Sequence, residues 1–363
     1  MAVQLLVNRF KNQGLPKLDG LTQGEIIEDA AAARALFSLC PSAAATAMDE
    51  FTEFAERASI ARLWVKREDQ RMGLGSFKAL GATHAIAKFA AQRAVEAGLE
   101  VTIENLRQVV ADVTFVCASA GNHGLSMAAG ARLFGAKAVV ILAETVPEGF
   151  AARLEEKQAK VLRAGANYEE SLDASIEMAA ENGWHLLADG TWDGYFEPAR
   201  DVLEGYMLMG DEFEDQIHEQ PTHIFLQAGV GGLAAAGAAT ARQIWGDGIK
   251  IIVVEPEAAP ALIESVRQGE CVTTPGPVSS MGRLDCKTPS HIALKYLARQ
   301  ADLFMTIDDE RVEKTVAELA AAGIATSPSG GAGIAALMHG RHLPELGLDE
   351  NSKVVCILSE GAA

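Results

Sequence analysis

The sequence predicts an α/β fold of two doubly wound lobes, each a parallel sheet covered by helices. Short apolar runs rich in valine and isoleucine alternate with longer segments of helical periodicity. The connections between them are short, and small or glycine-rich turns follow several apolar runs. Such βαβ alternation over 363 residues indicates two lobes with a ligand between them, at the carboxyl ends of the strands.

The elements can be placed along the chain from these patterns. Strands or extended segments are expected at 63–66, 113–117, 138–142, 167–168, 184–188, 223–228, 250–254, 302–307 and 353–358. Helices are expected at 78–97, 124–134, 148–164, 171–182 and 233–245. Residues 275–289 are expected to form a loop.

Composition narrows the possible partners. The net charge of −18 disfavours nucleic acid and anionic membrane surfaces, which both require basic patches. The five cysteines are scattered and lack CxxC spacing, so neither a disulfide framework nor a metal site is expected. The chain begins without a secretory leader pattern and has no long charge-free apolar run, which favours a cytoplasmic protein.

Lys78 is the first candidate catalytic residue. It follows Phe77 in Gly75-Ser76-Phe77-Lys78 and opens an apolar helical segment. Partial desolvation there would lower the pKa of the ammonium and leave a neutral amine able to attack an aldehyde. A solvated surface lysine is the competing interpretation.

A second loop, residues 119–124, carries groups suited to an anion. It reads Ser119, Ala120, Gly121, Asn122, His123 and Gly124, directly before a helix whose first N–H groups are free. An ordinary helix cap would explain one of these polar residues. Four small or polar groups in a row, around two glycines, are more than a cap needs, which favours a loop that binds an anion.

A glycine-rich loop at 229–233 is expected to bind a phosphate. Its residues are Gly229, Val230, Gly231, Gly232 and Leu233. It follows a strand and opens a helix, so backbone N–H groups can approach an anion closely. A tight turn that binds nothing is one alternative. A nicotinamide-dinucleotide site is another, because Glu255 ends the next strand where a ribose-binding acid would sit.

Three further segments end strands or precede helices. Asp189 follows an apolar strand, where such folds place chemistry, although an Asp before Gly often only forms a turn. Ser359 follows the apolar run 353–358 and is either a cofactor contact or part of a plain turn. Residues 326–333 are either a helix cap or part of the site. Trp192, Tyr195 and Tyr206 are expected to pack rather than to bind a ligand.

Taken together, these motifs resemble the fold type II pyridoxal-phosphate enzymes, the group with the tryptophan synthase β-like fold. Within that group the sequence is most similar to the diaminopropionate ammonia-lyases, from about residue 35 onward. The segments that carry the resemblance are 66–68, 75–78, 119–124, 189–195, 227–231, 254–256 and 282–286. The stretch 189–195, with its Asp-x-x-Trp-x-Gly-Tyr pattern, is the most discriminating.

The resemblance implies a role for each motif. Lys78 would bind the aldehyde of pyridoxal 5′-phosphate and move the Cα proton, while Asp189 acts as acid or base near the leaving group. Asn122 would contact the ring's phenolic oxygen, and Ser359 its pyridine nitrogen. Residues 229–233 would hold the phosphate, and the loop 119–124 would bind the substrate carboxylate. A large cofactor-binding lobe would comprise residues 1–80 and 190–363, and a small mobile lobe with the substrate loop would comprise residues 81–189.

The expected reaction is β-elimination from a β-substituted amino acid. The resemblance favours 2,3-diaminopropionate, converted to pyruvate and ammonia, and a homodimer. The related enzymes carry an Asp where this chain has Ala120, so activity on the D-isomer is not expected and the L-isomer is favoured. A serine, threonine or 3-hydroxyaspartate dehydratase, a nicotinamide-dependent dehydrogenase and a cofactor-binding protein without catalysis remain open as alternatives.

Overall fold

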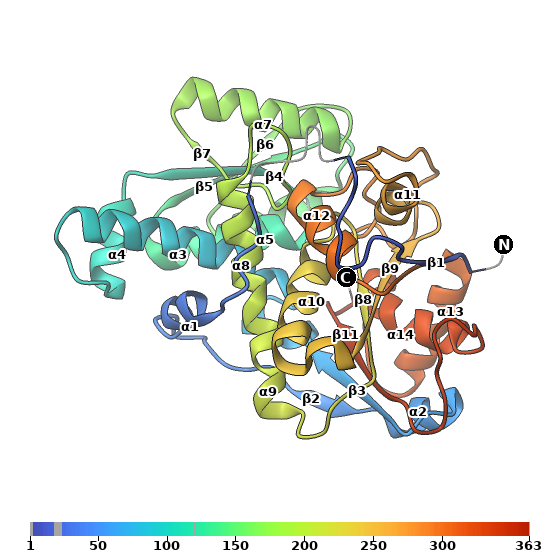
Figure 1. Cartoon of the computed structure of the whole chain (residues 1–363). Coiled ribbons are helices and arrows are strands. Elements are labelled where there is room, and N and C mark those ends of the chain that lie inside the picture. The colour runs from blue at the N-terminus through green and yellow to red at the C-terminus, as the bar shows by residue number, and fades with distance from the viewer. Residues whose placement is uncertain (1–2, 18–23, 120, 363) are drawn as a thin grey trace.

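The computed structural model describes residues 3–17, 24–119 and 121–362, and it contains a large and a small sheet (Figure 1). Within these residues the large sheet has seven strands. In spatial order they are β1 (Leu5–Val7), β10 (Leu303–Ile307), β9 (Lys250–Pro256), β8 (His223–Gln227), β11 (Lys353–Leu358), β3 (Arg62–Arg67) and β2 (Met48–Glu50). The edge strands β1 and β2 pair antiparallel, and the inner strands pair parallel.

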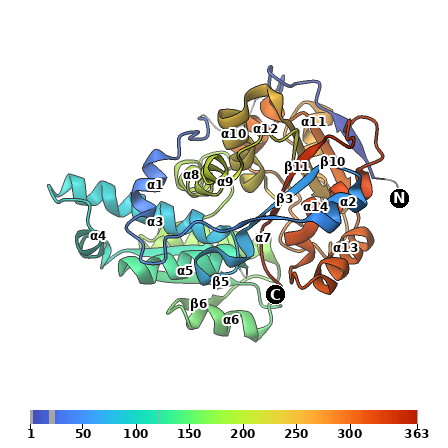
Figure 2. The ribbon, with the colours of Figure 1, turned by 90° about the horizontal axis from the view of Figure 1, so that it is seen from below.

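Helices cover both faces of the large sheet, as a parallel sheet requires. One face lies against α10 (Gly232–Trp245), which packs on α12 (His291–Gln300). The other lies against α14 (Pro328–Gly340), which packs on α13 (Asp309–Ala321) (Figure 2). The inner strands β9, β10 and β11 are accordingly mostly apolar, and β8 and β10 are buried at every position.

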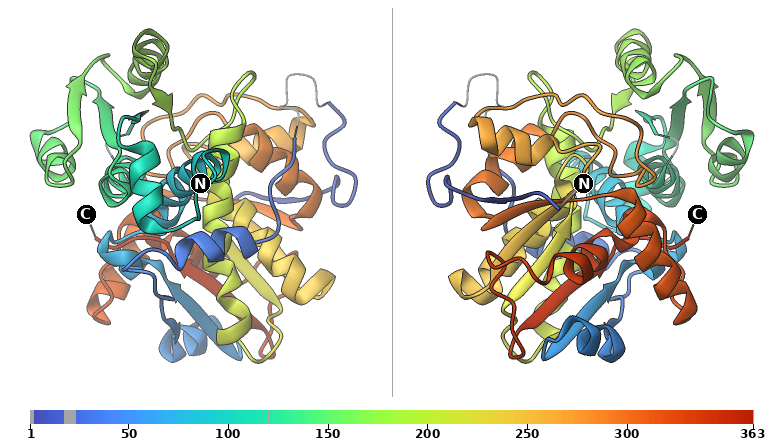
Figure 3. Two further views of the ribbon diagram at one scale, coloured as in Figure 1. Left: turned by 90° about the vertical axis from the view of Figure 1, so that its left-hand side faces the viewer. Right: turned by 90° about the vertical axis from the view of Figure 1, so that its right-hand side faces the viewer.

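The small sheet is parallel throughout and lies apart from the large one (Figure 3). Its order is β6 (Lys160–Arg163), β5 (Lys137–Leu142), β4 (Thr114–Ala118) and β7 (His185–Leu186). Alternate residues of β4 face opposite sides, because side chains alternate along a strand. Phe115 and Cys117 join the main core, whereas Val116 and Ala118 pack toward α7 (Tyr168–Asn182).

Two long helices join the sheets. The helix α3 (Lys78–Glu96) packs between α5 (Asn122–Phe134) and α8 (Glu197–Asp211), and α8 packs on α10. One continuous apolar cluster therefore includes Val140 of the small sheet and Ile224 of the large one. The expected division at residues 80 and 189, and the mobility of the smaller part, stay predictions.

The remaining helices lie around this frame. They are α1 (Ala31–Phe37), α2 (Thr52–Ala58), α4 (Ile103–Val110), α6 (Glu148–Glu155), α9 (Phe213–Gln216) and α11 (Ala261–Gln268), with the 3₁₀ turns η1 (Glu68–Gly73) and η2 (Gly246–Gly248).

Two sequence-based expectations for the small sheet are wrong. The helix expected over 148–164 ends at Glu155, and after a positive φ of 67° at Gln158 the chain forms β6 beside β5. The extended segment expected at 167–168 is the start of α7. Asn167 caps that helix by accepting the N–H of Glu170, and the Glu170 carboxylate accepts the N–H of Ala166, the residue before the cap.

Candidate functional site

The motif residues meet where parallel strands end. The segments after β4, β7, β8 and β11 carry Ser119, Asp189, Gly229 and Ser359. Carboxyl ends of parallel strands are where open α/β folds bind ligands. Lys78 reaches the same place from the first residue of α3.

Lys78 and Asp189 form a direct ion pair between Nζ and Oδ2. Their side chains are only 18% and 17% exposed. Burial lowers the pKa of the Lys78 ammonium, but the Asp189 carboxylate more than offsets this, so the net pKa is raised. Burial raises the pKa of Asp189, but Lys78 reverses this and the pKa falls below its ordinary value. The expectation that desolvation leaves the Lys78 amine neutral is therefore wrong, because the Asp189 carboxylate keeps the proton on the amine.

Two aromatic side chains line the amine. The Phe77 ring meets the Tyr206 ring edge-on at 4.8 Å, and Lys78 Nζ lies 5.6 Å from the Phe77 centroid. Tyr206 packs as expected, since it is 1% exposed. Burial raises the pKa of its hydroxyl, and Lys78 beside it opposes this rise through its charge and a hydrogen bond. The hydroxyl is therefore a buried polar group next to the Lys78 amine.

The turn 189–195 holds Asp189 in position. The Tyr195 hydroxyl donates to the Leu186 carbonyl at 3.1 Å and accepts the N–H of Ala188 at 2.9 Å. The ring of Trp192 stacks on Tyr195 with centroids 4.3 Å apart. These contacts fix the end of β7, so both aromatic residues pack, as expected, and thereby orient the carboxylate.

The predicted substrate loop lies at the start of α5. Gly121 donates its N–H to the Ser119 hydroxyl at 3.2 Å and precedes the first helical residue, Asn122. His123 bonds the Leu187 carbonyl through Nε2 at 2.7 Å, so Nε2 carries the proton. Burial lowers the pKa of His123, which keeps the ring neutral. Ala120 lies outside the described residues.

The glycine loop leaves room for an anion at the start of α10. Gly231 has a φ of 104°, and a Cβ there would lie 3.0 Å from Ala293 Cβ. A Cβ on Gly229 would lie 3.0 Å from Cys286 Sγ and 3.1 Å from the Arg283 carbonyl. No side chain caps α10 within the described parts of the chain, so its first N–H groups stay available. Gly232 and Leu233 begin the helix, and Val230 accepts the Ser290 N–H at 2.9 Å.

Glu255 does not act as the ribose-binding acid that a dinucleotide site requires. It is 1% exposed, and its carboxylate accepts the N–H groups of Leu262 and Ile263 at 2.7 and 2.8 Å. The side chain therefore caps α11 and does not face a ligand, so this alternative interpretation is wrong.

Ser359 and Glu360 close the site from the C-terminal side. Ser359 is 3% exposed, and its carbonyl accepts the Phe77 N–H at 3.1 Å. The Glu360 carboxylate is buried and bonds Asn122 Nδ2, Ser327 Oγ and Arg283 Nη1. Sequence reasoning did not identify Glu360 as a site residue; its position directly after Ser359 was the available signal. Ser327 caps α14, which agrees with the capping interpretation of 326–333, and it also belongs to this cluster.

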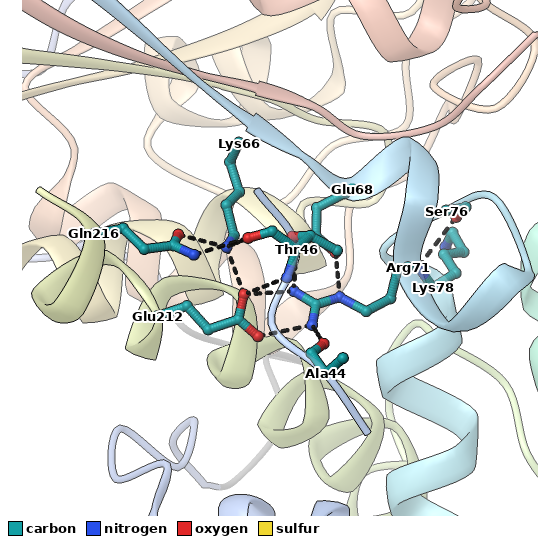
Figure 4. A network of polar contacts seen from close by, with 9 residues as sticks. All are labelled: Ala44, Thr46, Lys66, Glu68, Arg71, Ser76, Lys78, Glu212 and Gln216. Atoms are coloured by element: carbon teal, nitrogen blue, oxygen red, sulfur yellow. Dashed lines mark hydrogen bonds and ion pairs between the residues drawn. The ribbon is translucent and has the colours of Figure 1, made fainter. Parts of the chain in front are cut away.

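A buried network of charges lies behind the Lys78 loop (Figure 4). Arg71 donates to both Glu68 and Glu212, and Lys66 donates to Glu212 and Gln216. The side chains of Lys66, Glu68 and Arg71 are fully buried. The network holds η1 against α8 and α9, and η1 leads into Ser76, whose hydroxyl accepts the Lys78 N–H at 3.1 Å.

The described residues fit pyridoxal 5′-phosphate. They supply a largely buried lysine for its aldehyde, and a helix start where glycines at 229 and 231 leave room for its phosphate. By contrast, nowhere in the described chain do three or more His, Cys, Asp or Glu side chains gather in a way that suits a metal ion. The described helices also include none that is long and apolar enough to cross a membrane.

Comparison with known proteins agrees with a pyridoxal-phosphate site. The family of pyridoxal-phosphate dependent enzymes matches residues 41–360. Diaminopropionate ammonia-lyase of Salmonella typhimurium is 30% identical over 354 residues, 88% of this chain and 86% of that protein. The catabolic L-threonine dehydratase of Staphylococcus aureus is 28% identical over 73% of each chain. The crystal structure of Escherichia coli diaminopropionate ammonia-lyase with D-serine superposes with a TM-score of 0.88 at 23% identity, covering 99% of this chain and 94% of that one.

Proposed function

Since this chain belongs to the pyridoxal-phosphate dependent enzymes and uses that cofactor, we propose that it catalyses β-elimination from a β-substituted amino acid. The first candidate substrate is L-2,3-diaminopropionate, with pyruvate and ammonia as products. Similarity to the Salmonella ammonia-lyase supports this candidate. The observation that carries the proposal is the ion pair between Lys78 and Asp189, which places an amine and a carboxyl group side by side in the site.

The pair provides the proton transfers that elimination needs. Bound pyridoxal phosphate withdraws electrons from the substrate's Cα and so acidifies the proton there. The ion pair holds the proton on Lys78, so the ammonium must give it up before the amine can bind an aldehyde, and Asp189 is the adjacent group that can accept it. Once substrate has freed it, the Lys78 amine removes the Cα proton. Asp189, now carrying a proton, gives it to the leaving group, which departs more readily when protonated.

The other residues position substrate and cofactor. Ser119, Gly121 and His123, at the start of α5, bind the substrate carboxylate, together with Ala120 of the same loop. Residues 229–233 bind the cofactor's phosphate, and Phe77 lines its site. Asn122 contacts the phenolic oxygen of the ring. Ser359 faces the ring nitrogen, where a neutral hydroxyl leaves the ring less electron-withdrawing than a carboxylate would.

A dehydratase acting on serine, threonine or 3-hydroxyaspartate is the second candidate. Similarity to the Staphylococcus threonine dehydratase supports it, and so does Ala120, which gives the substrate loop no carboxylate at that position. Both candidates use the same amine and the same acid and differ only in the leaving group. Without that carboxylate to remove a proton from the opposite face, the L-isomer is the favoured substrate.

A substrate panel tests the proposal. Protein loaded with pyridoxal phosphate is mixed with L- and D-2,3-diaminopropionate, L-serine, L-threonine and 3-hydroxyaspartate, and the 2-oxo acid and ammonia released are measured. The ammonia-lyase proposal predicts the highest kcat/KM with L-diaminopropionate. Equal turnover of both diaminopropionate isomers would contradict the role given to Ala120, and no release from any compound would contradict the elimination itself. A homodimer and a cytoplasmic location remain further predictions, and sedimentation of the loaded protein tests the first of these.

A further inference from the structure

Glu360 fixes the end of the Arg283 side chain. Glu360 is 4% exposed, and its carboxylate accepts a hydrogen bond from Arg283 Nη1 at 2.9 Å. It also accepts hydrogen bonds from the Ser327 hydroxyl and the Asn122 amide, and its backbone carbonyl accepts the Thr326 hydroxyl at 2.6 Å. A carboxylate with this many partners cannot swing away, so the guanidinium that it holds is preorganised.

Arg283 spans the distance between the two predicted binding loops. Its carbonyl lies against Gly229, where a Cβ would approach it to 3.1 Å, and its N–H donates to the Ser329 hydroxyl at 3.1 Å. Its guanidinium reaches to Gly121 in the substrate loop. A Cβ placed on Gly121 would lie 3.9 Å from both Arg283 Nε and Ser119 Oγ. The guanidinium and the Ser119 hydroxyl therefore converge on one point beside the start of α5.

The guanidinium retains unused donors at that point. Nε is buried and has no hydrogen-bond partner among the residues that the structure describes. Arginine carries five N–H donors in a rigid fork that suits a carboxylate. Nη1 is the one guanidinium nitrogen of Arg283 with an acceptor in the described chain. A buried donor without a partner is costly, and a ligand oxygen beside Gly121 would satisfy it.

We infer that Arg283 is a binding residue for the substrate's α-carboxylate, acting together with Ser119 and the first N–H groups of α5. The inference rests on the proposed function, because it takes the substrate to be an amino acid. Arg283, which lies between α11 and α12, would add a positive charge to a carboxylate site whose other groups come from the end of β4 and the start of α5. The alternative is that Arg283 only completes the Glu360 cluster and never touches substrate.

Binding of a non-reacting ligand separates these alternatives. L-alanine has no β-substituent to eliminate, and L-alaninamide differs from it by lacking the carboxylate charge. Each is titrated into pyridoxal-phosphate-loaded protein, and binding is followed through the visible absorbance of the cofactor. The variants are Arg283→Gln, which removes the charge, and Arg283→Lys, which keeps the charge but not the fork. Arg267→Gln, at an exposed arginine paired with Glu264, is the control.

The inference predicts that Arg283→Gln weakens L-alanine binding by about ten- to a hundredfold, the usual range for a charge-assisted hydrogen bond, and leaves L-alaninamide binding within about twofold. Arg283→Lys should fall between Arg283→Gln and the unmodified protein. Equal losses for both ligands, or an unchanged preference for L-alanine, would overturn the role of Arg283 and leave the proposed function standing. If the unmodified protein bound neither ligand, the proposed function would fail, and the inference with it.

Discussion

Lys78 and Asp189 are 111 positions apart in the chain, yet the amine of one contacts the carboxylate of the other. Lys78 begins α3, and Asp189 follows the last strand of the small sheet. The contact exists only when α3 is docked against the small sheet. The reactive pair therefore depends on the packing of α3 and is not set by either segment alone.

Replacing Asp189 tests its role as acid and base. Asp189→Asn removes the proton acceptor beside Lys78 and the donor to the leaving group. We expect kcat to fall by about a hundredfold or more, the usual range for a lost general acid or base, while cofactor is still bound. Steady-state assays of oxo-acid release measure this. Asp193→Asn changes the exposed Asp of the same turn and should retain near-normal kcat. Comparable losses in both variants would show that the turn matters and not the carboxylate of Asp189.

Substituting Gly231 in the glycine loop 229–233 should lower the affinity for the cofactor. Gly231→Ala places a side chain at a φ of 104° and within 3.0 Å of Ala293 Cβ. Strain of about 1–3 kcal/mol at the phosphate loop should weaken pyridoxal phosphate binding by about five- to a hundredfold. Equilibrium dialysis of the variant measures the Kd. Gly149→Ala adds a methyl group in open space on α6 and serves as the control. Unchanged affinity in Gly231→Ala would place the phosphate elsewhere.

Removing Arg71 from the buried charge network should lower the stability of the fold strongly. Arg71→Met leaves Glu68 and Glu212 without their shared cation, and we expect the free energy of unfolding to fall by about 3–5 kcal/mol. Arg62→Met breaks a pair with Glu50 in which both side chains are about 40% exposed, and should cost at most about 1 kcal/mol. Urea unfolding gives both values. Similar losses in the two variants would mean that Arg71 is not the centre of a buried network.

The raised pKa of Glu255 should make the stability of the fold depend on pH. Burial raises its pKa from the ordinary 4.5 to about 8. Between these values the folded chain holds a proton that the unfolded chain has released, so this group's contribution to stability falls as pH rises from about 4.5 to about 8. The slope is at most about 1.4 kcal/mol per pH unit.

Glu255→Gln cannot titrate, so its stability should depend less steeply on pH over the same window. Glutamine also loses a hydrogen bond to α11 at every pH, because its amide nitrogen cannot accept one. The comparison therefore uses the slopes of unfolding free energy against pH and not the absolute values. Parallel profiles for the two proteins would contradict the raised pKa.

The sequence alone predicts most of the parallel framework. The strands β3, β5, β8 and β11 and the helices α3 and α10 lie within a few residues of their expected positions, since each has strong periodicity bounded by turns. The segment Lys160–Arg163 falls inside the helix predicted at 148–164, and its two adjacent apolar residues, Val161 and Leu162, fit a strand as well as a helix. Pairing with β5, which no local pattern reveals, decides in favour of a strand.

The candidate site was predictable one motif at a time but not as an arrangement. Lys78 and Asp189 were identified from their own surroundings, whereas their contact depends on how α3 packs. The contacts of Glu360 and Arg283 also depend on packing, because their partners lie at the start of α5, at the start of α14 and in the C-terminal segment. A charged residue near a chain end is usually solvated, and only the packed structure shows Glu360 to be buried.

Locating the lysine that carries the cofactor tests the account most directly. Protein saturated with pyridoxal phosphate is reduced with borohydride, digested, and its peptides are analysed by mass spectrometry. The account predicts a single pyridoxyl adduct on the peptide that contains Lys78, and none in Lys78→Ala protein treated in the same way. An adduct on any other lysine, or a fully loaded protein without one, would contradict it.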